Sequence, residues 1–303
     1  MCIRDRVIED DPDFARLLER KCHEKGFKCL AAPTGESGLE LAGKHLPSAV
    51  ILDISLPGMD GWGVLSALKD NTRTRHIPVH IVSVEEASTE ALRKGAVGHA
   101  TKPLSQESLE ETFRRLEEVS AGGPRRVLVV EDEAKIRRAT VKLIGNGDVK
   151  VDAAETGEQA MEALRSGHYD CVVLDLGLPD MDGNELLAKL EREGVELPPV
   201  IVHTARDLTR DEEAKLRERA GSIVIKDVRS QERLLDEVSL FLHRVVSNMP
   251  EKKRKIIRDL HDTDETLKAK KVLIVDDDMR TTFALSRLLS EKGMITLKAE
   301  NGE

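Results

Sequence analysis

Aromatic residues are scarce in this 303-residue chain, since one Trp, one Tyr and five Phe make up only 2% of it. Positive charge is also in the minority, because 47 Lys and Arg residues face 56 Asp and Glu residues, for a net charge of -9. Nucleic-acid binding generally needs a basic face and aromatic side chains on which bases stack. We therefore expect no direct binding of nucleic acid.

Long apolar runs and paired cysteines are missing as well. No apolar run exceeds about five residues, whereas a helix that spans a bilayer needs ~20, so we expect no membrane contact in this segment. The four cysteines form no CxxC pair, and the first residues have no apolar segment of a secretory signal. A reducing, cytoplasmic location is the expectation.

A repeated unit organises the chain. Four aliphatic residues followed by three acidic ones start at Val127 and again at Val272, and a shorter version starts at Val7. A Gly-Glu pair follows 25 residues after the second acidic residue of each copy, and in two copies an aspartate follows 43 residues after it. The residues with this spacing are Asp10, Gly35 and Asp53, then Asp132, Gly157 and Asp175, then Asp277 and Gly302. Such regularity indicates three copies of one unit.

Within a copy, short aliphatic runs alternate with amphipathic stretches. The runs at 49–52 and 171–174 have the composition of strands that are buried on both faces. In the first copy, Asp11 and Pro12 predict the start of a helix, and Gly26 lies where a helix would end. Alternating strands and helices predict right-handed βαβ crossovers and an open parallel sheet, so the fold class is α/β.

Composition sets the expected boundaries. They are a first unit at 1–120, a short joint at 121–124, a second unit at 125–247, a charged linker at 248–270 that reads as a connecting helix, and a truncated third unit at 271–303. Ile3-Arg-Asp-Arg6 places three charges where the first buried strand belongs, and burying them unpaired would cost several kcal/mol. We therefore expect that strand to be damaged at 1–6, with these residues foreign to the native sequence and the chain cut at Glu303.

Acidic residues follow two strands of the first unit. Glu9 and Asp10 come after the first strand and Asp53 ends the third, and the carboxyl ends of parallel strands lie at one edge of the sheet. Three neighbouring carboxylates repel one another unless a cation lies among them, and Mg²⁺ suits such oxygen ligands. Lys102 adds a positive charge and Ser83 a hydroxyl, so the set fits phosphoryl transfer to aspartate.

The second unit repeats this set. Taken singly, an acidic pair after a strand is more often a helix cap than a metal site, and a lone serine or lysine is only a loop residue. The joint recurrence argues against that interpretation. The second set is Glu131, Asp132, Asp175, Thr204 and Lys226.

Residues 52–61 and 174–183 resemble the phosphoacceptor motif of receiver domains in two-component response regulators, and the likeness covers nearly the whole chain. The resemblance implies a flavodoxin-like doubly wound sheet with strand order 2-1-3-4-5. It also implies that Asp53 and Asp175 each accept a phosphoryl group from the phosphohistidine of a histidine kinase or a phosphotransfer domain. Mg²⁺ would be held by the acceptor, the acidic pair and a backbone carbonyl. The carbonyl would be that of Ser55 or Gly177, and the third copy offers Asp276 and Asp277.

The resemblance further implies a switch. The hydroxyl of Ser83 or Thr204 would turn toward the phosphoryl group, and Lys102 or Lys226 would pair with it. The aromatic residue that normally reports the switch is replaced by His99 in the first unit and by Ile223 in the second. The second unit also has Lys226-Asp227 in place of the family's Lys-Pro, so it lacks the turn that usually orients the lysine.

The leading hypothesis is a phosphorelay segment from the C-terminal part of a hybrid histidine kinase, which contacts a downstream signalling protein. A stand-alone multi-receiver regulator, or a partly degenerate receiver that serves as an interaction module, is the alternative. A haloacid dehalogenase-like phosphatase is disfavoured, because such enzymes need a second aspartate where Ser55 and Gly177 stand. No GxxxxGK[ST] motif of a P-loop kinase occurs. His261 is expected to be an ordinary exposed histidine and not a phosphoryl donor.

Overall fold

The computed structural model describes residues 4–85, 88–120, 123–145, 147–195, 197–267, 270–275, 279–291 and 294–299. The chain forms two compact units, Met1–Asn248 and Met249–Glu303. The first unit contains two α/β modules, named here the first module (4–120) and the second module (123–248). No helix in the described part of the chain combines the length and the apolar character that crossing a bilayer requires.

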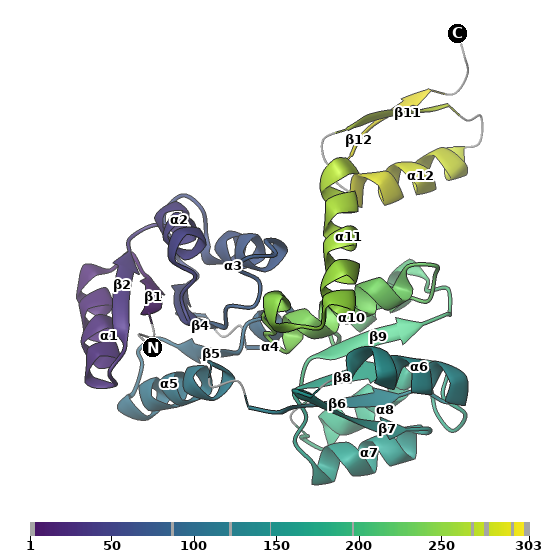
Figure 1. The fold of residues 1–303 in the computed structure, drawn as a ribbon, viewed down its shortest axis with the longest axis horizontal. Helices are drawn as coiled ribbons and strands as arrows, with labels where there is room; N and C mark the ends of the chain where they lie inside the picture. Colours follow the sequence, from purple (N-terminus) through teal and green to yellow (C-terminus); the bar gives the residue numbers. More distant parts are fainter. Residues whose placement is uncertain are drawn as a thin grey trace. The chain divides into compact units, whose positions relative to one another are not determined.

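The first module is a parallel sheet in the order β2-β1-β3-β4-β5 (Figure 1). Its elements are β1 (Arg4–Ile8), α1 (Pro12–Glu24), β2 (Lys28–Ala32), α2 (Gly35–His45), β3 (Ala49–Asp53), α3 (Gly61–Asp70), β4 (Val79–Ser83), α4 (Ser88–Arg93), β5 (Gly98–Thr101) and α5 (Gln106–Ser120). Alternate strand residues enter two cores, because side chains alternate between the faces of a sheet. Ile8 and Leu52 pack into the core on the face of the sheet that α2, α3 and α4 cover. Val7 and Ile51 pack into the core on the opposite face, which α1 and α5 cover.

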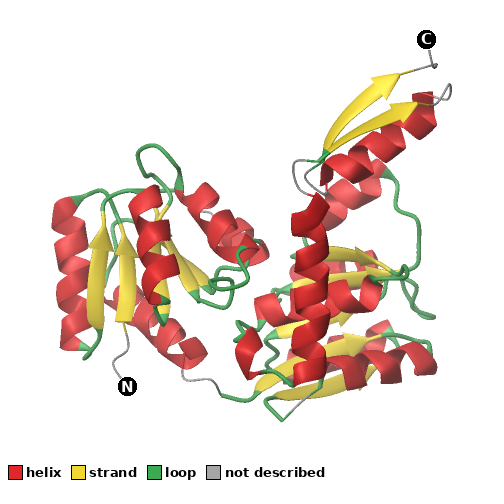
Figure 2. Cartoon of the chain, turned by 45° about the horizontal axis from the view of Figure 1, so that its top comes forward, coloured by secondary structure: helices red, strands yellow, loops and turns green. Residues whose placement is uncertain are grey.

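The second module repeats this plan in the order β7-β6-β8-β9-β10. Figure 2 shows its strands in yellow with helices in red packed against them. Its elements are β6 (Arg125–Val130), α6 (Ala134–Ile144), β7 (Val149–Ala154), α7 (Gly157–Ser166), β8 (Cys171–Leu174), α8 (Gly183–Arg192), β9 (Val200–Thr204), α9 (Arg210–Arg217), β10 (Ser222–Ile225), α10 (Ser230–Phe241) and η1 (Val246–Asn248). Counted along each module, both orders are 2-1-3-4-5. The predicted fold class is therefore confirmed.

The backbone of the first module forms its first strand in spite of the charged residues at its start. β1 runs from Arg4 to Ile8 and pairs with β2 on one side and β3 on the other. Backbone hydrogen bonds do not depend on side-chain type, and Val7 and Ile8, both fully buried, anchor the strand in the two cores. The side chains of residues 4–6 lie outside the described residues, so the foreign origin of this segment stays a prediction.

Local signals set the ends of the helices as expected. Asp11 caps α1 through its side chain, Pro12 occupies the first turn, and Gly26 follows the helix with a φ of 83°. The loops after β3 and β8 end at Asp60 and Asp182, whose side chains accept hydrogen bonds from the first turns of α3 and α8. These caps return the chain from each sheet edge into the next helix.

The C-terminal unit contains α11 (Glu251–Leu267), β11 (Lys271–Val275), α12 (Met279–Glu291) and β12 (Ile295–Ala299). The charged linker thus forms the expected helix. β11 and β12 pair in parallel, like the first two strands of each module. Leu273 is 60% exposed and Leu297 53% exposed, which fits a sheet with few covering elements among the described residues. Asp276 and Asp277 lie outside the described residues.

Candidate functional site

The ends of β1 and β3 bring three carboxylates of the first module together. Glu9, Asp10 and Asp53 each offer an oxygen within 4.8 Å of the other two. Glu9 and Asp53 are each only 3% exposed, whereas Asp10 is exposed. Because both strands run in the same direction, their carboxyl ends meet at this edge of the sheet, as the sequence predicted.

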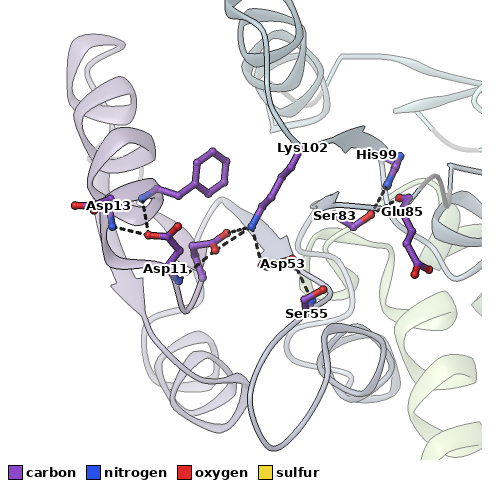
Figure 3. A network of polar contacts seen from close by, with 10 residues as sticks. Asp11, Asp13, Asp53, Ser55, Ser83, Glu85, His99 and Lys102 are labelled. Carbon is purple, nitrogen blue, oxygen red and sulfur yellow. Dashed lines mark hydrogen bonds and ion pairs between the residues drawn. The ribbon is translucent and has the colours of Figure 1, made fainter.

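Lys102, just after β5, reaches this cluster (Figure 3). Its Nζ lies 2.9 Å from both carboxylate oxygens of Glu9 and 2.8 Å from Oδ2 of Asp53. The ammonium also lies 4.6 Å from the ring centre of Phe14, a cation–π distance. Ser55 donates its backbone N–H to Oδ1 of Asp53 at 3.1 Å. Asp53 is thus held by a lysine on one oxygen and by its own loop on the other.

One lysine does not balance three carboxylates. Burial raises the pKa of Glu9 to about 7, and the Asp53 charge adds to the rise against the opposing effect of Lys102. Burial disfavours the charged form of Lys102, but its hydrogen bonds to Asp53 and Glu9 outweigh burial and raise its pKa. The acidic cluster therefore lacks positive charge. Its oxygen donors fit a hard divalent cation such as Mg²⁺, which retains water ligands and accepts phosphate oxygens.

Ser83, at the end of β4, is linked to His99 on β5 (Figure 3). The Ser83 hydroxyl donates to the backbone carbonyl of Glu85, and its oxygen lies 2.9 Å from Nε2 of His99. Since the hydroxyl proton is directed to Glu85, the ring nitrogen must donate the second hydrogen bond. The two residues named for a switch from the sequence are therefore in direct contact.

The second module reproduces the acidic cluster. Glu131, Asp132 and Asp175 again place carboxylate oxygens within 4.8 Å of one another, with Glu131 and Asp175 buried. Nζ of Lys226 lies 2.8 Å from Glu131 and 2.7 Å from Asp175. Burial again raises the pKa of Glu131. The backbone N–H of Gly177 points to Oδ1 of Asp175 at 3.4 Å, in the place that Ser55 has in the first module.

Lys226 reaches its partners although Asp227 stands in place of proline. The backbone N–H of Lys226 donates to the backbone carbonyl of Thr204 at 2.7 Å. The backbone N–H of Lys102 donates to the backbone carbonyl of Ser83 at the same distance. This main-chain bond places the two lysines alike, whether or not a proline follows. Ile223 packs against the apolar core, in the position that His99 has in the first module. The difference between the modules therefore concerns the switch position and not the lysine.

His203 has no metal-like grouping around it in the sequence. It is 4% exposed on β9, next to Thr204, and neither ring nitrogen has a hydrogen-bond partner among the described residues. Burial lowers its pKa to about 4, and the nearby Lys226 charge adds to this effect. The ring is therefore neutral at pH 7. A lone histidine in a sequence does not reveal whether it is buried or neutral. The one sequence feature that indicates burial here is the position of His203 in a strand that is buried on both faces.

The fold and the two acidic clusters together define a class of protein. Both modules are parallel α/β sheets that place an aspartate, an acidic pair and a lysine at the carboxyl edge, with a hydroxyl at the end of the fourth strand. This is the arrangement that phosphoryl transfer to a carboxylate needs.

Comparison with known proteins agrees. The family model described as "Response regulator receiver domain" matches residues 6–114 and 127–239. The chain belongs to this family, as a tandem of two receiver domains. This result leaves no support for a phosphatase of the haloacid dehalogenase kind.

Several curated proteins are similar. Response regulator PleD of Caulobacter vibrioides is 27% identical over 223 residues, which cover 64% of this chain and 48% of PleD. Protein PilH of Pseudomonas aeruginosa is 31% identical over 110 residues, 35% of this chain and 91% of PilH. The chain thus spans about half the length of PleD. Among solved structures, a putative response regulator from Chloroflexus aurantiacus is 25% identical, covers 40% of this chain and 99% of its own, and has a TM-score of 0.37.

Proposed function

We propose that Asp53 and Asp175 are phosphoacceptors in a Mg²⁺-dependent phosphorelay and that the donor is a phosphohistidine of a histidine kinase or a phosphotransfer domain. The observation that carries this proposal is the recurrence, in two modules, of an aspartate held by a lysine beside a buried glutamate and an exposed aspartate. Ligands for the metal would be the three carboxylates of each module, together with the backbone carbonyl of Ser55 or Gly177.

In the transfer, a carboxylate oxygen of Asp53 forms a bond to phosphorus while the phosphorus–nitrogen bond of the donor breaks. The electron pair of that bond returns to the histidine nitrogen, which takes a proton from water. Bound Mg²⁺ would supply positive charge that offsets the charge of the phosphoryl oxygens. Lys102 then exchanges its carboxylate partners for the new phosphoryl group, and the Ser83 hydroxyl releases the Glu85 carbonyl and donates to a phosphoryl oxygen.

Phosphorylation would change protein contacts through this rearrangement. In the first module the movement of Ser83 reaches His99 directly, whereas in the second module Ile223 has no polar atom with which to follow Thr204. We expect the first module to respond more strongly. Three predictions from the sequence belong to this proposal: the chain comes from the C-terminal part of a hybrid histidine kinase, it is cytoplasmic, and it contacts a downstream signalling protein. The chain alone contains no P-loop kinase motif.

The test is to incubate the full chain with Mg²⁺ and a small acyl phosphate, and to locate acid-labile phosphate by peptide mapping. We expect label on both aspartates, loss from one module in Asp53→Asn or Asp175→Asn, and no label in the double variant. Asp70→Asn removes an exposed carboxylate at the end of α3 and is the matched control, which should label normally. Label that persists in the double variant would contradict the proposal.

A further inference from the structure

The two modules anchor their acidic loops by different means. In the first module, the side chain of Asp11 caps α1 and accepts hydrogen bonds from the backbone of Asp13 at 2.8 Å and Phe14 at 3.3 Å. In the second module, the residue at the cap of α6 is Glu133, which makes no side-chain cap hydrogen bond. A missing cap typically costs about 1 kcal/mol and leaves the loop before the helix less restrained.

Arg137, near the start of α6, restrains the acidic loop of the second module through hydrogen bonds to the backbone of that loop. One guanidinium nitrogen donates to the backbone carbonyls of both Glu131 and Asp132, at 2.8 Å each. The second terminal nitrogen pairs with Glu155, just after β7. The Arg137 side chain is only 12% exposed, whereas its partner Glu155 is 60% exposed, so the packing around α6 covers the guanidinium but not the carboxylate. The first module has Ala15 at the equivalent position, which cannot make such bonds.

The two carbonyls belong to the acidic pair itself. Holding a carbonyl fixes the peptide plane on which the neighbouring side chains are mounted, so Arg137 restrains where the carboxylates of Glu131 and Asp132 can lie. These carboxylates lie within 4.8 Å of Asp175, and their mutual repulsion favours an opened loop. Charge-assisted hydrogen bonds from an arginine are among the stronger ones in proteins, so the restraint opposes this opening.

We propose that Arg137 is a positioning residue for the metal site of the second module and does the work that Asp11 does in the first. This inference rests on the proposed function, because it assumes that the acidic pair binds Mg²⁺. Partners that orient metal ligands without touching the metal typically change affinity 10–100-fold. Arg137 acts through the backbone, so we expect the lower end, about a tenfold loss of Mg²⁺ affinity in Arg137→Ala.

The experiment titrates the full chain with Mg²⁺ alone and follows the backbone amide signals of Gly177 and Ser55 by NMR, because each amide is bonded to the acceptor of its own module. Arg137→Ala should raise the midpoint for Gly177 about tenfold and leave that for Ser55 unchanged. Asp11→Ala should raise the midpoint for Ser55 and leave that for Gly177 unchanged. The control is Arg138→Ala, because the Arg138 side chain donates to the carbonyl of Ala134 in its own helix and to no other group in the described part of the chain, so neither midpoint should move.

A phosphorylation assay separates positioning from general damage. In Arg137→Ala, the Mg²⁺ concentration for half-maximal labelling of Asp175 should rise about tenfold, while the rate at saturating Mg²⁺ stays within about twofold of the parent. Arg137→Lys keeps the charge but has fewer fixed donors, so its Mg²⁺ concentration for half-maximal labelling should lie between those of the parent and Arg137→Ala. An unchanged midpoint in Arg137→Ala, or an equal shift in Arg138→Ala, would overturn the inference. Failure of the parent to label at any Mg²⁺ concentration would instead refute the proposed function, and the metal titration would still decide the role of Arg137.

Discussion

The raised pKa of Glu9 predicts how the stability of the metal-free first module depends on pH. Burial raises this pKa from 4.5 to about 7, so between these values the folded chain binds a proton that the unfolded chain has lost. The free energy of unfolding must therefore fall as pH rises through this interval. Below pH 4.5 both states are protonated and Glu9 contributes nothing. Above pH 7 the folded state carries the whole cost of the buried charge.

The size of this effect follows from the same two values. One pKa unit corresponds to ~1.4 kcal/mol, so the contribution of Glu9 is at most about 3 kcal/mol between pH 4.5 and 7. His80 contributes with the opposite sign, because burial lowers its pKa to about 4 and stability then rises with pH up to about 6.5. The parent curve alone would mix the two effects. The difference between the parent and Glu9→Gln isolates Glu9.

The assay is urea unfolding of the chain in a chelator, at pH 5, 6, 7 and 8, followed by fluorescence. Trp62 is the only tryptophan and lies in α3, so its signal reports the first module. The free energy of unfolding of the parent, minus that of Glu9→Gln, should fall as pH rises from 5 to 7 and level off above. Saturating Mg²⁺ should remove the fall, because the metal favours the carboxylate form.

The control is Glu40→Gln, which removes an exposed glutamate from α2 and should leave the pH dependence of the parent unchanged. If the parent and Glu9→Gln have parallel curves between pH 5 and 7, Glu9 is ionised throughout, and the argument that the acidic cluster lacks positive charge is wrong.

Two further predictions concern the loops beside the acidic clusters. Gly61→Ala should destabilise the first module by more than ~2 kcal/mol in urea unfolding, because a Cβ there would lie 2.1 Å from the backbone oxygen of Asp53. The control is Gly43→Ala, where a Cβ would meet nothing within 4 Å and should not destabilise the module. Equal losses of stability in the two variants would refute the reasoning. Asp180→Ala should cost the second module about 1 kcal/mol, because Asp180 accepts hydrogen bonds from Gly157 and Glu158 at the start of α7; an unchanged urea midpoint would contradict this.

Much of the fold could be predicted because its signals are local. Aliphatic runs specify buried strands, and Asp11, Pro12 and Gly26 specify the ends of a helix through their own backbone preferences. The placement of Asp10 and Asp53 at one sheet edge also follows from the sequence, since parallel strands end together. At β1 the charges of residues 4–6 are a local pattern that gives no sign of a central strand, whereas pairing with two neighbouring strands sets its backbone.

The sequence by itself determined the repeat, the parallel α/β modules and the two acidic clusters, because spacing and strand direction are properties of the chain. Only the tertiary structure decided which groups hold those clusters in place. Lys102 contacts Glu9 across 93 residues of sequence, Arg137 bonds the carbonyls of the acidic loop, and His203 is buried without a partner among the described residues. Such contacts depend on distances and burial that arise only when separate strands pack together, and no local pattern encodes them.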